Sequence, residues 1–271
     1  MIDQETRMSM LKLVFGTALA ATTLASATPS AAVISTFAQF EAIGTRGQTY
    51  WKNNGTTSSN GTGGSIYTTN TPTSTTPGSR LVRFSFLQPS IAPYVTSLTA
   101  SYTLFASVAA TPAQSLAGFL VQPGISGSFS FVTTAPLTIG ATTFATGSNL
   151  LTGIFTQAAI FGPVNGTAGS FSSSTSSGAM ITYTSDFLSF APTVDRDFAI
   201  SFTSISSPLA RASATKSLRT FRAFSTGSFS SDPAPLVTAV PEPQVWGLMI
   251  VGFGMVGLQV RRRQRRVTVT G

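Results

Sequence analysis

The chain has 271 residues and a formal net charge of +8, yet charged residues make up only 9% of it, against about 25% in a typical soluble domain. It contains no cysteine and no histidine, which excludes disulfide bonds, thiol nucleophiles, structural zinc sites and the histidine base of a Ser-His-Asp triad. The 42% hydrophobic content, with 21 phenylalanines, is enough for a packed core. Frequent Thr, Phe and Val beside scarce Glu and Lys favour strands.

Much of the positive charge lies at the two ends of the chain. Five arginines fall between residues 261 and 266, and residues 33–235 keep nine basic and five acidic residues, a net charge of +4. So mild an excess is unlike the charge footprint of a nucleic-acid-binding surface. We therefore expect no nucleic-acid partner.

Residues 1–32 are typical of a secretory signal peptide. Lys12 precedes the apolar run LVFGTALAATTLASA, and small residues follow at 25–27 and 30–32. This order of a basic residue, an apolar stretch and small-residue sites is the pattern of a cleaved leader. The alternative, an N-terminal core helix, lacks an amphipathic pattern. We expect export, with cleavage after Ala27 or Ala32.

The body is expected to start with residues 33–52, in which 33–50 predict an opening strand or a short helix. Residues 53–79, NNGTTSSNGTGGSIYTTNTPTSTTPGS, form a low-complexity polar stretch with few side chains to bury. Such a composition predicts a long flexible loop.

Residues 80–231 predict the main all-β body. Apolar and polar side chains alternate through 80–87, 94–105 and 198–205, as in strands with one buried face and one wet face. Further strands are predicted at 116–122, 127–132, 137–144, 150–156, 179–190 and 218–230. Many short strands separated by Gly, Pro or Asn favour an antiparallel β-sandwich or jelly roll.

The phrase Gly-Ser-Phe-Ser recurs at 127–130, 169–172 and 227–230. A β-solenoid needs a fixed repeat, and these intervals are unequal. We interpret the phrase as a common sheet-edge sequence and not as a repeat unit.

The carboxylates of the body fall in no recognisable catalytic or metal-binding motif. Asp195 and Asp197 are spaced so that they could share a calcium ion. The EF-hand spacing is missing, however, and Arg196 between them offers an ion-pair partner, which favours a solvated turn. No carboxylate pair matches a glycosidase motif. We expect no catalytic residue, no metal site and no cofactor.

The body has one basic cluster, in the segment RASATKSLRTFR. It predicts contact with an anionic exopolysaccharide or with lipopolysaccharide phosphate. The alternative is a solvated face, or a set of charges that guards an edge strand against sheet-to-sheet pairing. Its members are Arg211, Lys216, Arg219 and Arg222.

Beyond a predicted linker at 232–240, the C-terminal end combines prolines, an apolar run and arginines. Residues 245–260 are apolar except for Gln259, and a helix of this length reaches about 24 Å, short of the ~30 Å hydrocarbon core of a bilayer. Trp246 would lie at the membrane interface, and snorkelling arginines extend the span. Arginines on the C-terminal side place the tail in the cytoplasm and the body outside.

These residues together resemble the PEP-CTERM sorting signal in its PEPxxWA form, with Gly247 where that form has Ala. The resemblance covers residues 241–266, before a short tail at 267–271. The residues that carry it are Pro241, Glu242, Pro243, Trp246, Gly247, Arg261, Arg262 and Arg263.

The resemblance implies an exported protein of a Gram-negative bacterium that an exosortase recognises in the inner membrane. The enzyme is expected to cleave near the Pro-Glu-Pro triplet and to release or transfer the body to the surface. Proteins with this signal commonly accompany exopolysaccharide and biofilm operons.

We therefore expect an exported structural protein of the cell surface or extracellular matrix, with a transient single-pass stage in the inner membrane. Exosortase and the secretion machinery are its expected transient partners, with the inner membrane before processing, and anionic exopolysaccharide is the further partner that we expect. The alternatives are a carbohydrate-binding adhesion module and a secreted hydrolase, which needs two body carboxylates in one pocket. An adhesion module needs exposed aromatic residues in one groove, drawn from Trp51, Tyr50, Tyr67, Tyr94 and Tyr183.

Overall fold

The computed structural model describes residues 34–44, 47, 49–192 and 195–238. The predicted signal peptide, with Ala27 and Ala32, and the predicted sorting segment lie outside these residues. Among the described residues there is no helix long and apolar enough to cross a membrane. The elements are β1 (Ser35–Ala42), β2 (Thr49–Asn53), β3 (Gly64–Thr68), β4 (Arg80–Phe86), β5 (Leu98–Val108), β6 (Gln114–Leu116), β7 (Phe119–Thr133), β8 (Leu137–Ile139), β9 (Thr142–Phe144), β10 (Asn149–Pro163), β11 (Gly169–Ser174), the 3₁₀ turn η2 (Thr175–Ser177), β12 (Ile181–Thr184), β13 (Leu188–Ser189), β14 (Asp195–Ser206), β15 (Phe221–Asp232) and β16 (Leu236–Val237).

The strands pair antiparallel, which confirms the predicted all-β antiparallel body. Eight of them form a closed circuit of hydrogen-bonded neighbours in the order β1, β15, β14, β11, β10, β7, β5 and β4. β2 and β3 lie between β15 and β5, while β6 pairs with β7 and β12 with β10. Within this circuit each strand has a neighbour on both sides, which is one way in which sheets avoid open edges.

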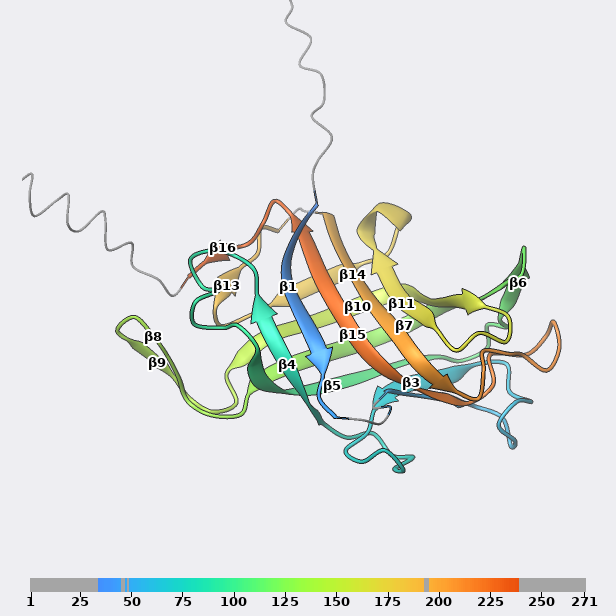
Figure 1. The fold of residues 1–271 in the computed structure, drawn as a ribbon. Coiled ribbons are helices and arrows are strands. Elements are labelled where there is room, and N and C mark those ends of the chain that lie inside the picture. The colour runs from blue at the N-terminus through green and yellow to red at the C-terminus, as the bar shows by residue number, and fades with distance from the viewer. Residues whose placement is uncertain (1–33, 45–46, 48, 193–194, 239–271) are drawn as a thin grey trace, which may run out of the picture. The chain divides into compact units, whose positions relative to one another are not determined.

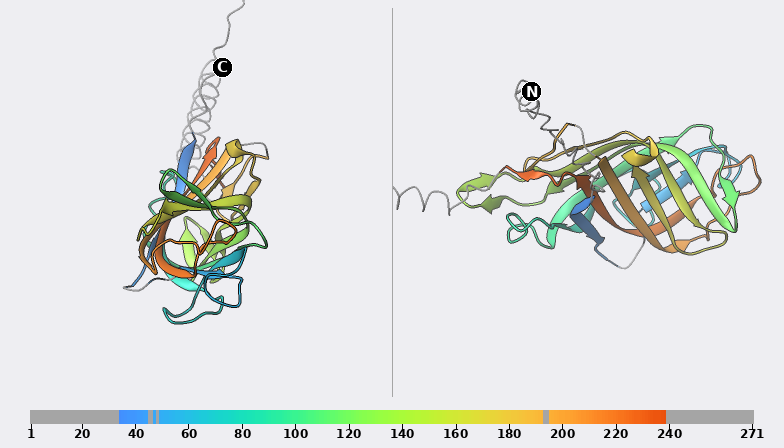
Figure 2. Two further views of the ribbon diagram at one scale, coloured as in Figure 1. Left: turned by 90° about the vertical axis from the view of Figure 1, so that its right-hand side faces the viewer. Right: turned by 90° about the horizontal axis from the view of Figure 1, so that it is seen from above.

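The circuit is folded into two layers whose strands cross (Figures 1 and 2). β4, β1, β15, β14 and β11 form one layer, and β5, β7 and β10 form the other. The pairing register shifts between β10 and β7 near Gln157, which has a φ of 54°, and between β14 and β15 near Ser204, which has a φ of 50°. Such irregularities bend a strand locally and increase its twist. Bends of this kind let a strand pass from one layer to the other where the layers cross.

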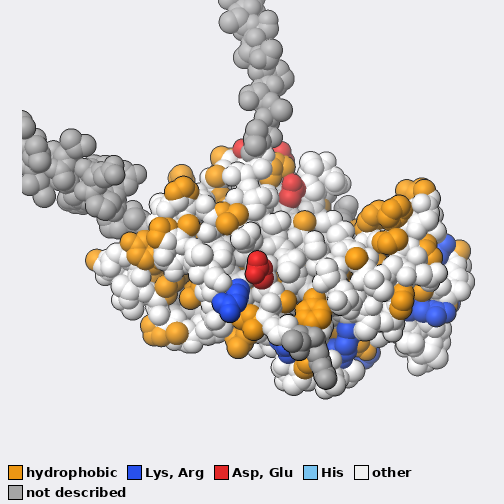
Figure 3. All heavy atoms as spheres, in the orientation of Figure 1, with side chains coloured by type: hydrophobic (Ala, Val, Ile, Leu, Met, Phe, Trp, Pro, Cys, Tyr) orange, Lys and Arg blue, Asp and Glu red, His pale blue; other side chains and the backbone are white. Residues whose placement is uncertain are grey.

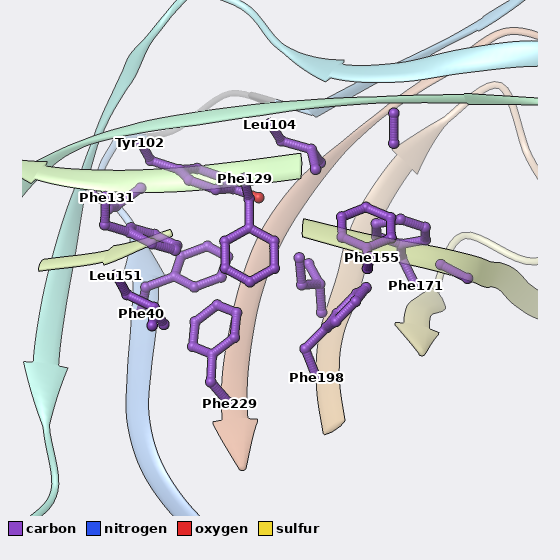
Figure 4. Packing of buried hydrophobic residues seen from close by; sticks show 14 of the residues in the cluster. Phe40, Tyr102, Leu104, Phe129, Phe131, Leu151, Phe155, Phe171, Phe198 and Phe229 are labelled. Carbon is purple, nitrogen blue, oxygen red and sulfur yellow. The ribbon is translucent and has the colours of Figure 1, made fainter. Parts of the chain in front are cut away.

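The side chains between the layers form one phenylalanine-rich core (Figure 4). Phe129 of β7 packs on Phe229 of β15 with ring centroids 4.8 Å apart, and Phe155 of β10 packs on Phe198 of β14 at the same distance. All four rings are buried. Aromatic pairs of this kind contribute about 0.5–1.5 kcal/mol beyond the burial of their area, so these contacts join the two layers.

The Gly-Ser-Phe-Ser phrases lie in β7, β11 and β15, which have neighbours on both sides, so their assignment to sheet edges was wrong. A Cβ on Gly127 would lie 2.4 Å from the Cα of Ala106, which is why a residue without a side chain is needed where two strands approach closely. In each phrase the phenylalanine is fully buried; these are Phe129, Phe171 and Phe229.

The predicted alternation is confirmed in 80–87 and 198–205. The start of the strand predicted at 94–105 was wrong, because Tyr94 is exposed in a turn and β5 begins at Leu98. The ranges 116–122 and 127–132 belong mostly to the single long strand β7, and 137–144 and 179–190 each divide into two strands. The residues that alternate into the core are Val82, Phe84, Phe86, Phe198, Ile200 and Phe202.

The prediction of one long loop at 53–79 was wrong, because this segment contains β3. β3 pairs with β2 on one side and with β5 on the other, and its Ile66 is fully buried. The hydroxyl of Tyr67 donates to the carbonyl oxygen of Thr75 at 2.6 Å, which holds the following turn. Burial, with a smaller contribution from Tyr50, raises the pKa of Tyr67.

Asn53 organises the first part of the same segment. Its amide nitrogen donates to the Ser217 hydroxyl at 2.7 Å and to the Leu218 carbonyl at 2.9 Å. Its side-chain oxygen accepts from the backbone N–H groups of Gly55 at 2.9 Å and Gly61 at 2.8 Å. The buried amide of Asn53 therefore makes four hydrogen bonds. They order a polar, glycine-rich segment that has few apolar side chains to bury.

The segment 232–240, predicted as a linker, is held to the body through Thr238. β16 pairs with β13, and the backbone N–H of Thr238 donates to the Phe187 carbonyl at 3.1 Å. The Gln88 side chain also donates to the Pro235 carbonyl at 2.6 Å. The predicted linker is thus part of the folded body as far as the structure describes it.

Candidate functional site

The outer surface of β1, β15, β14 and β11 consists mainly of small, uncharged polar side chains. Figure 3 shows this surface as largely white, with few charged or hydrophobic groups. We name it the hydroxyl face. Its residues alternate with core residues along each strand; they are Thr36, Gln39 and Glu41 of β1, Thr226, Ser228 and Ser230 of β15, Asp197, Ala199, Ser201 and Thr203 of β14, and Ser170, Ser172 and Ser174 of β11.

Strand pairing sets these side chains in rows across the sheet. Ser228 lies opposite Gln39 on one side and Ala199 on the other, and Ala199 lies opposite Ser172. Neighbouring strands are about 4.8 Å apart, and successive outward residues of a strand are about 7 Å apart. The face is therefore a regular array of hydroxyl groups.

A first groove, of about 540 Å³, follows β15 between β1 and β14. Its floor is formed by small residues, among them Gly227 and Ser228. Glu41 is its one carboxylate, and Ser201 contributes a hydroxyl group. The groove is open and lined by polar and apolar atoms alike, so it suits an extended ligand better than a compact, fully enclosed one.

A second groove, of about 500 Å³, follows β11 and β14 and shares Ala199 and Ser228 with the first. Serine hydroxyls, the Gln157 amide and Asp197 line it. The Oδ1 atom of Asp197 is buried and has no hydrogen-bond partner among the described residues. An unpaired buried acceptor costs free energy, and because Oδ1 is closed to solvent, only the other oxygen of the Asp197 carboxylate is available to a ligand in the groove.

Several hydroxyl groups of the face are available to a ligand. Thr36 and Ser230 bond to each other at 3.1 Å. In contrast, the side chains of Ser172, Ser201 and Ser228 make no hydrogen bond within the part of the chain that the structure describes. Each such hydroxyl can both donate and accept.

A buried arginine supports the face from below. Arg196 donates to the carbonyl oxygens of Ile181 at 2.9 Å and Ala191 at 2.7 Å, and its guanidinium lies 6.0 Å from the ring centroid of Tyr183. The Tyr183 hydroxyl donates to the backbone carbonyl of Asp197 at 2.5 Å. Burial raises the pKa of Tyr183 and lowers the pKa of Arg196. These contacts fix the strand that presents Asp197.

The predicted polyanion-contacting residues do not form a single patch. Arg211 and Lys216 lie on one loop against Ala113, whose carbonyl accepts from the Arg211 guanidinium and whose N–H donates to the Lys216 carbonyl at 3.0 Å. Arg219 follows on the same segment and is exposed. Contact of these residues with a polyanion stays a prediction.

Arg222, the fourth of these residues, is engaged elsewhere. Its guanidinium lies 4.2 Å from the ring centroid of Tyr50 and donates to the Ser74 carbonyl. This geometry is that of a cation–π contact. Arg222 therefore holds the 69–76 turn against the sheet, which its place in the sequence did not indicate.

The aromatic residues required for a sugar-binding groove line neither groove. Trp51, Tyr67 and Tyr183 are buried, and Tyr94 is exposed in the turn before β5. Tyr50 packs on Tyr67 with ring centroids 5.5 Å apart, on the outer side of β2 and β3. Trp51, Tyr67 and Tyr183 are part of the buried packing, and Tyr50 makes the Arg222 contact.

Three of the five carboxylates among the described residues, those of Asp195, Asp197 and Asp232, lie at one end of the β14–β15 pair. Asp195 and Asp197 belong to β14, so their assignment to a solvated turn was wrong, and Asp195 lies opposite Asp232. Among the described residues no group of three or more His, Cys, Asp or Glu side chains could hold a metal ion. Each groove holds one carboxylate, Glu41 in the first and Asp197 in the second.

The hydroxyl face was not foreseen from the sequence. Its signal is the run of Ser and Thr at alternate positions of strands whose other side is buried, as in Ser201 and Thr203. That pattern identifies a wet face in one strand, but it does not tell which strands lie side by side. The predicted sorting residues, from Pro241 to Arg263, lie outside the described part of the chain.

Comparison with known protein families, with curated proteins and with solved structures gives no match to this chain. From its own fold and surface, the protein is classified as an antiparallel all-β body whose outer face carries rows of hydroxyl groups.

Proposed function

We propose that this chain is an exported structural protein of the cell surface or extracellular matrix, and that its body associates with exopolysaccharide through the hydroxyl face. The observation that carries the proposal is the pair of shallow grooves, about 540 and 500 Å³, that share Ala199 and Ser228. Sugar hydroxyls donate and accept hydrogen bonds. The face offers hydroxyls and amides that also do both, and two carboxylates that accept. An extended glycan chain would lie along the two grooves.

The route to the surface is proposed from the two ends of the sequence. The predicted signal peptide supports export, and the PEP-CTERM resemblance supports a transient inner-membrane stage followed by exosortase cleavage. The body is consistent with this route, because it is cysteine-free and of low charge. We describe its two crossed layers as a β-sandwich with jelly-roll character.

A non-catalytic role is part of the proposal. Hydrolysis of a glycoside needs two carboxylates about 5–10 Å apart across the scissile bond, and each groove holds one. An adhesion module that binds one defined glycan is the second candidate. The Asp197 carboxylate in the second groove favours it, because its accessible oxygen is an acceptor for one sugar hydroxyl.

Retardation of the full chain in native gels that contain polysaccharide tests the proposal. A neutral β-glucan and alginate serve as the probes. Ala199→Gln with Ser228→Gln fills both grooves with bulk but adds no charge, and we expect it to remove most of the retardation. Thr103→Gln, on the exposed side of β5, is the matched control and should leave the retardation unchanged.

One further variant, with three substitutions, separates contact through the hydroxyl face from contact through the basic residues. Replacement of Arg211, Lys216 and Arg219 by Gln should leave retardation by the neutral glucan intact. Loss of retardation in this triple variant, with retention in the groove variant, would assign polysaccharide contact to the basic residues and contradict the role of the hydroxyl face.

A further inference from the structure

Four exposed hydrophobic side chains lie together around β6, apart from the hydroxyl face. The exposed fractions are 70% for Leu116, 39% for Phe119, 41% for Phe161 and 41% for Val164. Leu116 lies directly opposite Phe119 in the β6–β7 pair, and the Phe119 and Phe161 rings stack with centroids 4.8 Å apart. We name these four residues the apolar tip. Exposed hydrophobic side chains that are contiguous mark interaction surfaces more often than scattered ones do.

The backbone that carries the apolar tip is fixed. Ala117 and Gly118, with φ of 49° and 86°, form a tight turn between β6 and β7, the geometry of a two-residue hairpin. The Val164 N–H donates to the Gly118 carbonyl at 2.9 Å, and the Asn165 N–H donates to the Leu209 carbonyl at 2.8 Å. The hydrophobic side chains are therefore displayed on a preformed surface.

Basic residues border the apolar tip. Arg211 and Lys216 are bound to Ala113, the residue directly before β6, and Arg219 is exposed nearby on the same segment. Ala113 and Leu116 are about 10 Å apart along the strand. Figure 3 shows hydrophobic and basic side chains next to each other on the side of the body where Figure 1 shows β6.

Three of the described acidic residues lie far from the apolar tip. Asp195 and Asp197 are at the start of β14, and Asp232 is at the end of β15. The opposite ends of these strands meet where Ser206 pairs with Arg222, about 30 Å from Asp197 at 3.3 Å per residue. The segments 111–121, 160–169 and 209–219, which form the apolar tip and carry its cations, contain no acidic residue, so this surface is apolar and positive.

We propose that the apolar tip and its three cations dock on an anionic phospholipid bilayer. Such a bilayer offers an apolar interior for Leu116, Phe119 and their neighbours, and negative headgroups for the cations, so it matches both components of the surface. A polysaccharide chain would leave the hydrophobic side chains in water. A second copy of this surface would bring like charges together, which opposes self-association.

Site-specific fluorescence on the full chain tests this proposal. Because the sequence has no cysteine, Leu116→Cys can carry a single dye whose emission shifts to shorter wavelength when it leaves water. Ser201→Cys, on the hydroxyl face, reports on the other surface. Vesicles of phosphatidylcholine alone, vesicles with added phosphatidylglycerol, and dextran sulfate are the probes.

We expect a shift at position 116 with phosphatidylglycerol vesicles, little shift with neutral vesicles or dextran sulfate, and no lipid response at position 201. Lys216→Gln with Arg219→Gln should raise the lipid concentration at half-maximal shift by roughly thirtyfold, at about 1 kcal/mol for each cation. Phe119→Ser with Phe161→Ser should reduce the shift itself, while circular dichroism checks that each variant is folded.

Three results would overturn the proposal: no shift at position 116 in anionic vesicles, an equal shift in neutral vesicles, or a shift produced by dextran sulfate. The last of these would assign the surface to an anionic polysaccharide. Polysaccharide binding through the hydroxyl face is read at position 201 and in the gel assay, so the failure of one proposal is distinguishable from the failure of the other.

Discussion

The rings of Phe129 and Phe229 lie 4.8 Å apart, although their strands, β7 and β15, belong to different layers and do not pair with each other. Each is the third residue of a Gly-Ser-Phe-Ser phrase and is fully buried. The phrase therefore places a large ring between the layers, beside a glycine that lets a neighbour approach. The packing of the two layers depends on this contact.

Phe229→Ala is expected to lower the free energy of unfolding by about 3–5 kcal/mol, because it removes a buried ring and leaves a cavity between the layers. Urea unfolding followed by circular dichroism measures the loss. Phe105→Ala is the matched control, since Phe105 is 52% exposed on β5. A similar loss for both variants would contradict the assignment of Phe229 to the centre of the core.

Gly153→Ala is expected to cost about 1–3 kcal/mol through overpacking. A Cβ at position 153 would lie 2.3 Å from the Cζ atom of Phe129. The clash should be relieved by Phe129→Leu, so the cost of Gly153→Ala should be smaller in that background. A double-mutant cycle in urea measures the coupling, and strictly additive costs would show that the two residues do not meet.

Tyr102→Phe is expected to stabilise the protein by about 1 kcal/mol at pH 7, because the Tyr102 hydroxyl is buried without a hydrogen-bond partner among the described residues and phenylalanine removes that penalty. The ring stays stacked on Phe131, whose centroid is 4.5 Å away. Unfolding midpoints in urea measure the difference. A clear loss of stability at pH 7 would show that the hydroxyl has a partner.

Tyr102→Phe should also change how the free energy of unfolding depends on pH in alkaline solution. Burial raises the pKa of Tyr102 well above its ordinary value of 10. Above pH 10 the unfolded chain ionises at Tyr102, whereas the folded protein keeps the phenol protonated. The contribution of neutral Tyr102 to the free energy of unfolding is therefore full below pH 10 and is lost as the pH rises above it. The advantage of Tyr102→Phe should grow by about 1.4 kcal/mol per pH unit above pH 10. An advantage that does not change between pH 9 and 11 would contradict the raised pKa.

Asn53→Ala is expected to lower the free energy of unfolding by about 2 kcal/mol or more, because it leaves two backbone N–H groups without their acceptor. Hydrogen exchange at Gly55 and Gly61 should become faster. Asn60→Ala, which removes an exposed amide bonded to Thr56 and Thr57, should have a smaller effect on stability. Equal effects would show that the 53–63 segment does not depend on its buried amide.

The sequence predicted the strands that alternate strictly, as β4 and β14 show, because burial on one side imposes a period of two. It did not predict β3, since the Ser/Thr/Gly-rich stretch around it obtains its order from distant partners, such as Ser217 and Leu218 for Asn53. Those contacts join residues more than 160 positions apart. No local pattern carries that information.

The candidate site was hidden for the same reason. The rows of hydroxyl groups exist only because β1, β15, β14 and β11 are neighbours in the sheet, and β11 was not predicted as a strand. The basic cluster was visible as a charge pattern, yet the structure separates Arg222, on Tyr50, from the three residues beside β6. The sequence shows which residues are basic or carry hydroxyl groups. Which of them lie side by side is decided by the order of the strands in the sheet.

Intact mass measured after cell fractionation, with and without the expected exosortase, tests the central claim of an exported and processed surface protein most directly. The account predicts a surface or extracellular form that begins after Ala27 or Ala32 and ends near the Pro241–Pro243 triplet when the enzyme is present. Without the enzyme, the C-terminal segment should be retained. A full-length chain that ends at Gly271 and stays in the inner membrane of cells with the enzyme would contradict the account.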